Sequence, residues 1–529
     1  MQCNGGRLTG VSLWLTATGL VLLLEVQMIC HRTRSVTLAA SSTNRTAPPC
    51  ERFIGRTACG GDGIRLGGVG QRHTSAILVV GSTGSALEGE FEVTLKVERA
   101  DTHHVRRDNL RSNCGARVPT HGDAAPWQVP GSNERCLPPQ SRVKPNQVIP
   151  PRPPQLDVSR RVFFIHSRCG SLDDPASYST IDCRLVGEAA SIRVYAEQSV
   201  LNGDRLHELI DELTQLADET IGPAIHDLIG SVRDVDGDGK LAVVLTARLG
   251  QRDTVLADVD GLTRASDFAR QPLRPFGNEA DVVFLNANLE PGERLRAVLA
   301  HEWAHAAIFS RRYGAGGRES EQLPAEDDWL NEALAHWVEV RASGSSSNVA
   351  HRIQQFLERP EAAPLLVRDY YRPEFWRHHG CRGAAFLFLD WCIGQSGPQL
   401  IDRLIDGDKF GVENLERATA RSLEDLFREW TTSIGTNLTR HNEMADLVAN
   451  RTDPNATALC QSNLAIRPTF HEWRPQQLES RSITLRLRGT SAAFVRLTLD
   501  EAATNWRLIT DAPPACGLQL TVIPIETAE

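Results

Sequence analysis

One short segment carries the clearest chemistry of the sequence: residues 301–305 read His-Glu-Trp-Ala-His. On a helix, histidines four residues apart project from one face, so both imidazoles can point at a single ion. Zinc suits such a pair of nitrogen ligands. Glu302 is rotated about 100° from His301 around the helix axis, which places its carboxylate beside the metal. The pattern therefore predicts His301 and His305 as zinc ligands and Glu302 as the general base.

The alternative reading of this segment is two core histidines and a glutamate on a helix surface. The surrounding residues 291–309 are predicted to form one largely apolar, buried helix, with Pro291 in its first turn. A lone glutamate in such a helix is unfavourable unless it faces a cavity, a partner or a metal. The apolar context therefore favours the metal site.

A catalytic zinc needs a third protein ligand and an open position for water. The metzincin pattern would place Gly at 308 and His at 311, whereas this chain has Ile308 and Arg311, so that class is excluded. The other arrangement takes a glutamate from a second helix, and residues 329–335 (Trp-Leu-Asn-Glu-Ala-Leu-Ala) look like that helix. Glu332 is the candidate ligand. His336 shares its helical face and is the alternative.

Taken together, these residues resemble the gluzincin zinc metallopeptidases, and most of all the hyicolysin family, over about residues 161–433. The segments that carry the resemblance are residues 234–240, 281–285, 299–305 and 329–335. The resemblance implies a thermolysin-like domain and a secreted zinc-dependent endopeptidase. It implies His301, His305 and Glu332 as the ligands, and Glu302 as the base. The M1 aminopeptidases share the zinc pattern, but their Gly-x-Met-Glu-Asn motif is absent here.

The chain departs from the gluzincin pattern around the third ligand. Residues 311–328, rich in Gly and charge, are predicted to be an inserted surface loop. Four residues after Glu332, where a carboxylate commonly orients a ligand histidine, this chain has His336. Asn331 and His336 are the candidates to support the metal ligands from outside.

The residue that stabilises the oxyanion is less clearly marked. It is expected just before a predicted apolar helix at 383–391, where the candidates are Tyr370, Tyr371, His378 and His379. His379 is the predicted residue, and an ordinary surface or capping histidine is the alternative.

A second candidate metal site lies upstream. Asp234, Asp236 and Asp238, interleaved with glycines, resemble the first half of a calcium loop. The twelfth position of an EF-hand would be Glu, but here it is Leu245. The competing interpretation is a plain Asp/Gly turn into a strand.

The predicted fold class is α+β, a metallopeptidase domain flanked by small β-rich regions. The expected sections are a signal peptide or membrane anchor at 1–36, a β-rich region and candidate propeptide at 37–136, a Pro-rich linker at 137–156, the zinc metallopeptidase domain at 157–440 and a C-terminal β-domain at 441–529. The expected strands are 76–80, 89–97, 161–166, 191–195, 241–246, 281–285, 482–487, 493–499 and 518–525, and a helix is expected within 204–228.

The charge of the chain limits the classes of binding partner that are expected. The 529 residues carry a net charge of −9 without a basic run, so nucleic acid is not an expected partner. A protein or peptide substrate is expected, and a membrane is expected only through an uncleaved N-terminal segment. Arg7 before the apolar stretch 11–24 predicts an extracytoplasmic protein, either secreted or held at the cell surface or in the periplasm.

The chain has twelve cysteines, ten of them after residue 36. With an export segment this even number favours disulfides, paired in sequence order, over free thiols. The alternative to a peptidase is a surface-binding or adhesive protein whose zinc domain is inactive. The intact Glu302 argues against it.

Overall fold

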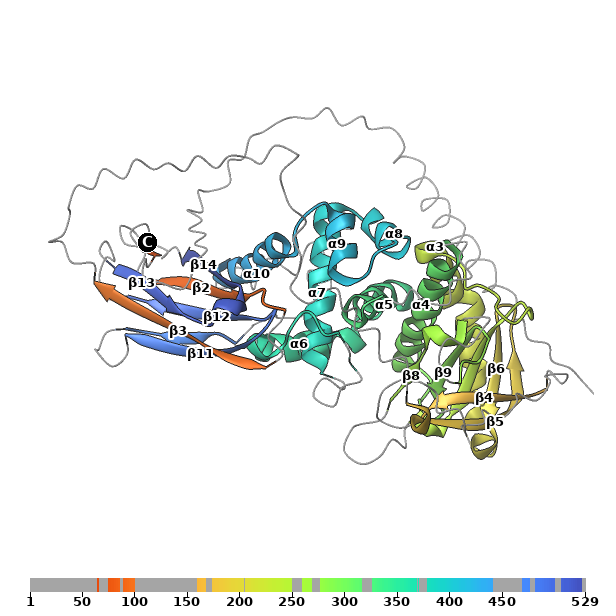
Figure 1. Cartoon of the computed structure of the whole chain (residues 1–529). Coiled ribbons are helices and arrows are strands. Elements are labelled where there is room, and N and C mark those ends of the chain that lie inside the picture. The colour runs from red at the N-terminus through yellow and green to blue at the C-terminus, as the bar shows by residue number, and fades with distance from the viewer. Residues whose placement is uncertain are drawn as a thin grey trace, which may run out of the picture. The chain divides into compact units, whose positions relative to one another are not determined.

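The computed structural model describes residues 64–65, 75–85, 89–99, 159–167, 174–203, 205–249, 259–268, 276–315, 326–368, 370, 378–440, 469–475, 481–499 and 506–525. Within these ranges the chain is a mixture of helices and sheets (Figure 1). The predicted signal segment at 1–36 and the Pro-rich linker at 137–156 lie outside the described residues.

A six-stranded sheet forms the part of the domain that precedes the metal helix. Its strands are β4 (Arg160–His166), β5 (Tyr178–Glu188), β6 (Ile192–Glu197), β7 (Leu241–Thr246), β8 (Gly261–Leu262) and β9 (Val282–Asn286), in the order β4-β5-β6-β7-β9-β8. β6, β7 and β9 are parallel, and β8 runs antiparallel to β9 at the edge. β7 and β9 are buried at every residue, as continuous apolar runs in parallel strands predict. The four strands predicted in this region are confirmed, while β5 and β8 were not predicted.

Two helices, α2 (Leu206–Leu216) and α3 (Gly222–Ile229), lie between β6 and β7 in the chain. The helices that follow β9 are α4 (Glu293–Ala315), α5 (Asp328–Ser343), α6 (Ser347–Glu358), α7 (His379–Ser396), α8 (Gln399–Ile405), α9 (Gly411–Thr419) and α10 (Leu423–Arg440). α4 packs on the sheet strands β8 and β9, and α5 packs on α4 and on α7 (Figure 1). The predicted metal helix and glutamate helix are therefore neighbours. α4 begins at Glu293, two residues after Pro291.

Two further sheets form a β-sandwich. One contains β10 (His471–Trp473), β12 (Ala492–Thr498), β2 (Ser75–Ser82) and β14 (Leu518–Ile525), in that order. The other contains β1 (Ile64–Arg65), β13 (Trp506–Asp511), β3 (Glu90–Arg99) and β11 (Ser482–Arg488). The N-terminal and C-terminal β-rich sections are expected from the sequence as separate regions, but their strands pair within the same two sheets.

Strand β2 is buried on both faces, because one face packs against the other sheet and the opposite face packs against α10. Leu78 and Val80 belong to the core between the two sheets, whereas Ile77 and Val79 belong to the larger core that also includes Phe427 of α10. This alternation is the period of two expected for a strand. The apolar run of β2 is explained by a core on each side.

The predicted disulfides are not found among the described cysteines. Cys183, Cys381 and Cys392 are free and buried, and Cys516 is buried as well. Sequential pairing would join Cys381 to Cys392, but both lie on α7, and eleven residues of helix separate them by roughly 16 Å along the axis. A disulfide requires Cα atoms within about 7 Å. The cysteines that would pair with Cys183 and Cys516 lie outside the described residues.

A search of the described helices for a segment long and apolar enough to cross a membrane finds none.

Candidate metal centre

The two predicted histidine ligands lie one turn apart on the buried face of α4. Their side chains are almost fully buried, with 7% exposure for His301 and 5% for His305. The two Nε2 atoms are 3.2 Å apart. The spacing in the sequence therefore does bring two imidazole nitrogens to one point.

Glu332 faces this pair from α5. Its Oε2 lies 3.5 Å from the Nε2 of His301, and its Oε1 lies 3.9 Å from the Nε2 of His305. Zinc bonds of about 2.0–2.1 Å in a tetrahedron place neighbouring ligand atoms about 3.3 Å apart. Donor atoms at these spacings are compatible with a tetrahedral zinc that keeps one position open, and α5 contributes the Glu332 carboxylate.

A buried carboxylate orients His301 from the side away from Glu332. Oε2 of Glu339, which is fully buried, accepts hydrogen bonds from Nδ1 of His301 at 3.0 Å and from Nδ1 of His336 at 2.7 Å. Its Oε1 accepts from Nδ2 of Asn348 at 2.9 Å. A proton on Nδ1 of His301 leaves the Nε2 lone pair for a metal, because a neutral imidazole carries one proton. Glu339 is thus placed as carboxylates commonly are beside metal-binding histidines.

The predicted general base lies against the edge strand of the sheet. Oε2 of Glu302 accepts a hydrogen bond of 2.7 Å from the hydroxyl of Thr263, just after β8. Gly261 of β8 gives the carboxylate its room, because a Cβ at that position would lie 2.5 Å from Cγ of Glu302. The edge strand therefore defines where the base sits.

In the metal-free cluster the charges shift the pKa of each member, and a metal must displace the second proton of His301 to bind at its Nε2. Burial alone would lower the pKa of His301, but its hydrogen bonds to Glu332 and Glu339 outweigh that effect and raise the pKa to about 9. Burial, followed by the charge of His301, lowers the pKa of His305 to about 4. Burial raises the pKa of Glu302 to about 7, against the opposing charge of His301. A base with a pKa near neutrality is well matched to proton transfer at neutral pH.

Helix α7 adds a cation to the site. Nη1 of Arg382 lies 2.9 Å from Oε2 of Glu332, and its guanidinium lies 5.0 Å from the ring centre of Tyr370. Burial would raise the pKa of Glu332, but the charge of Arg382 and the two histidines hold that pKa well below its ordinary value. The Tyr370 hydroxyl is buried and has no hydrogen-bond partner among the described residues.

The other predicted supporting residues occupy different places. His379 begins α7 and packs edge-on against His351 of α6, with ring centres 4.7 Å apart. His378 caps the same helix through a hydrogen bond from the backbone N–H of Cys381. The amide side chain of Asn331 counteracts the lowering of the pKa of His305, as expected of a neighbour of that ligand.

The candidate calcium residues form a different group from the predicted one. Carboxylate oxygens of Asp234, Asp236 and Asp281 lie within 4.8 Å of one another, with the buried Asp281 in the place expected for Asp238. Asp238 pairs with Arg193 at 2.6 Å. Asp234 accepts three backbone N–H bonds within its own loop, which is the geometry of an Asp/Gly turn.

Four residues of the site were not predicted from the sequence: Gly261, Thr263, Glu339 and Arg382. Glu339 lies seven residues after Glu332 on the same helix, so helical spacing alone would have placed both on one face. Gly261 and Thr263 belong to or follow a two-residue strand that has no pattern of its own. Arg382 reaches Glu332 through the packing of α7 on α5, which is a tertiary contact that no local pattern indicates.

Similarity to known proteins is confined to solved structures. No protein-family model matches the chain, so the hyicolysin resemblance rests on its motifs alone. No curated protein matches either. Among solved structures, an M1 zinc metallopeptidase from Deinococcus radiodurans is 14% identical with a TM-score of 0.27 over 53% of this chain and 60% of its own. A two-domain M1 zinc metallopeptidase variant bound to L-arginine is 12% identical with a TM-score of 0.25 over 53% of this chain and 59% of its own. The present chain thus spans about three fifths of their length.

Proposed function

We propose that this chain is a zinc-dependent endopeptidase that hydrolyses peptide bonds of extracytoplasmic proteins. The observation that carries the proposal is the triangle of His301, His305 and Glu332, with Glu302 buried on the same helix as the two histidines. Two imidazole nitrogens and one carboxylate with an open fourth position are a donor set of catalytic zinc. The extracytoplasmic location rests on the apolar stretch at residues 11–24 behind Arg7.

Each residue of the site has a separate role in the proposed hydrolysis. When bound, zinc lowers the pKa of a coordinated water to about 7 and polarises the scissile carbonyl. Glu302 takes the proton of the attacking water and delivers it to the leaving amine. Thr263 holds the Glu302 carboxylate through its Oε2, and Glu339 fixes the tautomer and orientation of His301. Arg382 and the buried Tyr370 hydroxyl are the candidate donors to the oxyanion.

A peptide substrate is favoured over a small molecule by the edge strand. β8 is the last strand of its sheet, and its Gly261 lies against the carboxylate of Glu302. An extended peptide can add to such an edge through main-chain hydrogen bonds. That docking would carry a peptide bond past the base and the metal ligands.

The test is hydrolysis of an unfolded protein by the purified full-length chain, with and without a chelator and after zinc is restored. We expect chelation to abolish cleavage and zinc to restore it. The Glu302→Gln variant is the matched control, because it keeps the shape of the side chain and removes the base. We expect it to bind zinc as the parent does and to lose at least about a hundredfold in kcat.

Cleavage that persists in the Glu302→Gln chain would contradict the assignment of the base. A chain that binds zinc but cleaves no peptide bond would contradict the peptidase proposal and favour a zinc-stabilised binding protein.

A further inference from the structure

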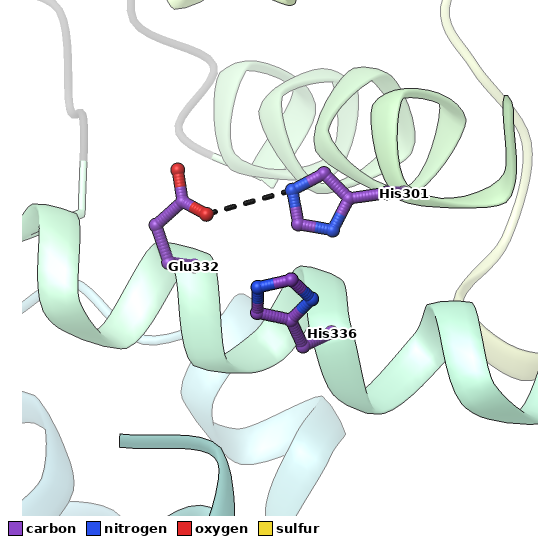
Figure 2. Close-up of side chains that lie close together, drawn as sticks. All are labelled: His301, Glu332 and His336. Atoms are coloured by element: carbon purple, nitrogen blue, oxygen red, sulfur yellow. Dashed lines mark ion pairs between the residues drawn. The ribbon is translucent and has the colours of Figure 1, made fainter. Parts of the chain in front are cut away.

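Three side chains of helix α5 that can bind a proton or a metal face α4. Glu332, His336 and Glu339 are spaced four and three residues apart, so they lie on one face of the helix. Figure 2 shows His336 beside Glu332 on this helix, with its ring below that of His301. The ring centres of His301 and His336 are 4.4 Å apart. His336 therefore belongs to the same buried cluster as the predicted ligands.

Of the two ring nitrogens of His336, Nδ1 has a hydrogen-bond partner and Nε2 has none among the described residues. Nδ1 faces Oε2 of Glu339 at 2.7 Å and must carry a proton, because an ionised carboxylate only accepts hydrogen bonds. In a neutral ring the lone pair is then on Nε2. Nε2 is buried, the residue is 1% exposed, and this atom has no hydrogen-bond partner among the described residues. A buried lone pair without a donor is unfavourable unless a cation meets it.

His336 lies beside two other side chains that can bind a metal. One donor atom from each of His301, Glu332 and His336 lies within 4.8 Å of the other two. These are two imidazoles and a carboxylate, the same types of donor as in the set that contains His305. Two sets of three donors thus share His301 and Glu332.

We propose that His336 is an alternative third donor of the metal centre, which can bind a divalent cation through Nε2 together with His301 and Glu332. This rests on the metal site of the proposed function, but not on its catalysis. His336 can complete a three-donor set when His305 is absent.

A double-mutant cycle on the full-length chain tests this. The variants are His305→Ala, His336→Asn and the combination of both, with zinc affinity measured by competition against a chromogenic chelator. Asn suits position 336 because its amide N–H can still donate to Glu339 while the Nε2 lone pair is lost. We expect His305→Ala to retain measurable zinc binding, and the added His336→Asn change to weaken it at least about tenfold.

Cobalt(II) provides a second readout, independent of hydrolysis. In the His305→Ala background, the visible spectrum of bound cobalt should change on replacement of His336, because a nitrogen ligand is lost. Equal zinc affinity and equal cobalt spectra in the single and double variants would overturn the proposal. A parent chain that binds no zinc would overturn it together with the metal site, whereas a parent that binds zinc without hydrolysis would overturn only the proposed function.

Discussion

At the scale of single residues, Glu339 shows how the chain replaces an expected partner. The gluzincin pattern expects a carboxylate four residues after the ligand glutamate, and this chain has His336 there instead. Glu339, three residues later on the same face, accepts from both His301 and His336. One carboxylate oxygen thus orients two imidazoles. The pair of histidines on α4 was predicted from the sequence. Helical spacing would also have placed Glu339 on the face of Glu332, but its contact with His301 depends on the packing of α5 on α4.

Glu339→Gln should weaken zinc binding. The amide has one acceptor oxygen instead of two, so it cannot accept from both His301 and Asn348 as the carboxylate does. We expect zinc affinity to fall about 10- to 100-fold, measured by competition with a chelator. Asn348→Ala is the control, because it removes only the contact to Oε1 and should have the smaller effect. Unchanged zinc affinity in Glu339→Gln would show that the carboxylate does not orient His301.

Asp281 should make stability depend on pH. Burial, aided by the charges of Asp236 and Asp234, raises the pKa of this carboxyl from 3.8 to about 7. The folded chain then holds the proton more tightly than the unfolded chain, so the contribution of Asp281 to the free energy of unfolding decreases as pH rises from about 4 to about 7. Asp281→Asn keeps an oxygen for the N–H of Val235 and does not titrate.

Thermal unfolding of both chains, measured with a chelator present, tests this prediction. Relative to the parent, Asp281→Asn should be more stable at pH 8 than at pH 5. A difference between the two chains that does not vary with pH would contradict the raised pKa.

At the scale of elements, segments with a clear local pattern were predictable, whereas the eleven-residue β5 and the two-residue β8 were not. β7 and β9 are continuous apolar runs, and α4 and α5 carry motifs with helical spacing, so each was predicted from local pattern. β8 has only two residues and is a strand because β9 pairs with it. Yet β8 sets the position of the base. Its contribution depends on contacts between elements, which residue types and spacing do not reveal.

Gly261→Ala tests the contribution of β8. The added methyl group would lie 2.5 Å from Cγ and Oε1 of Glu302, so the buried carboxylate would have to move. Because small displacements of catalytic groups have large effects on rate, we expect kcat to fall between about tenfold and a hundredfold while zinc content is kept. Gly89→Ala is the matched control, since a methyl group at that position would have no other atom within 4 Å among the described residues. Full activity in Gly261→Ala would show that Glu302 does not depend on the strand.

At the scale of the whole molecule, the β-sandwich joins segments that are far apart in the sequence. β2 lies between β12 and β14, and β3 lies between β13 and β11. The individual strands β2, β3, β11, β12 and β14 were predicted from their alternation, but β2 and β3 find their partners roughly four hundred residues away. Two sections in which apolar and polar residues alternate can form two small domains or one shared domain. Local pattern is the same in both cases, so only the observed pairing decides between them.

This pairing bears on the candidate propeptide at residues 37–136. Val93, Leu95 and Val97 of β3 are completely buried in the core between the two sheets, and β2 is buried on both faces. If a specific protease site is inserted between residues 100 and 158 and cleaved, the N-terminal fragment should remain bound, because its release would expose the centre of both sheets. Gel filtration of the cleaved chain should show the two fragments eluting together without denaturant and apart in denaturant. A Leu95→Asp variant places a charge in this core and should release the fragment after cleavage. Separation of the fragments of the cleaved parent chain under native conditions would identify the N-terminal section as a removable propeptide.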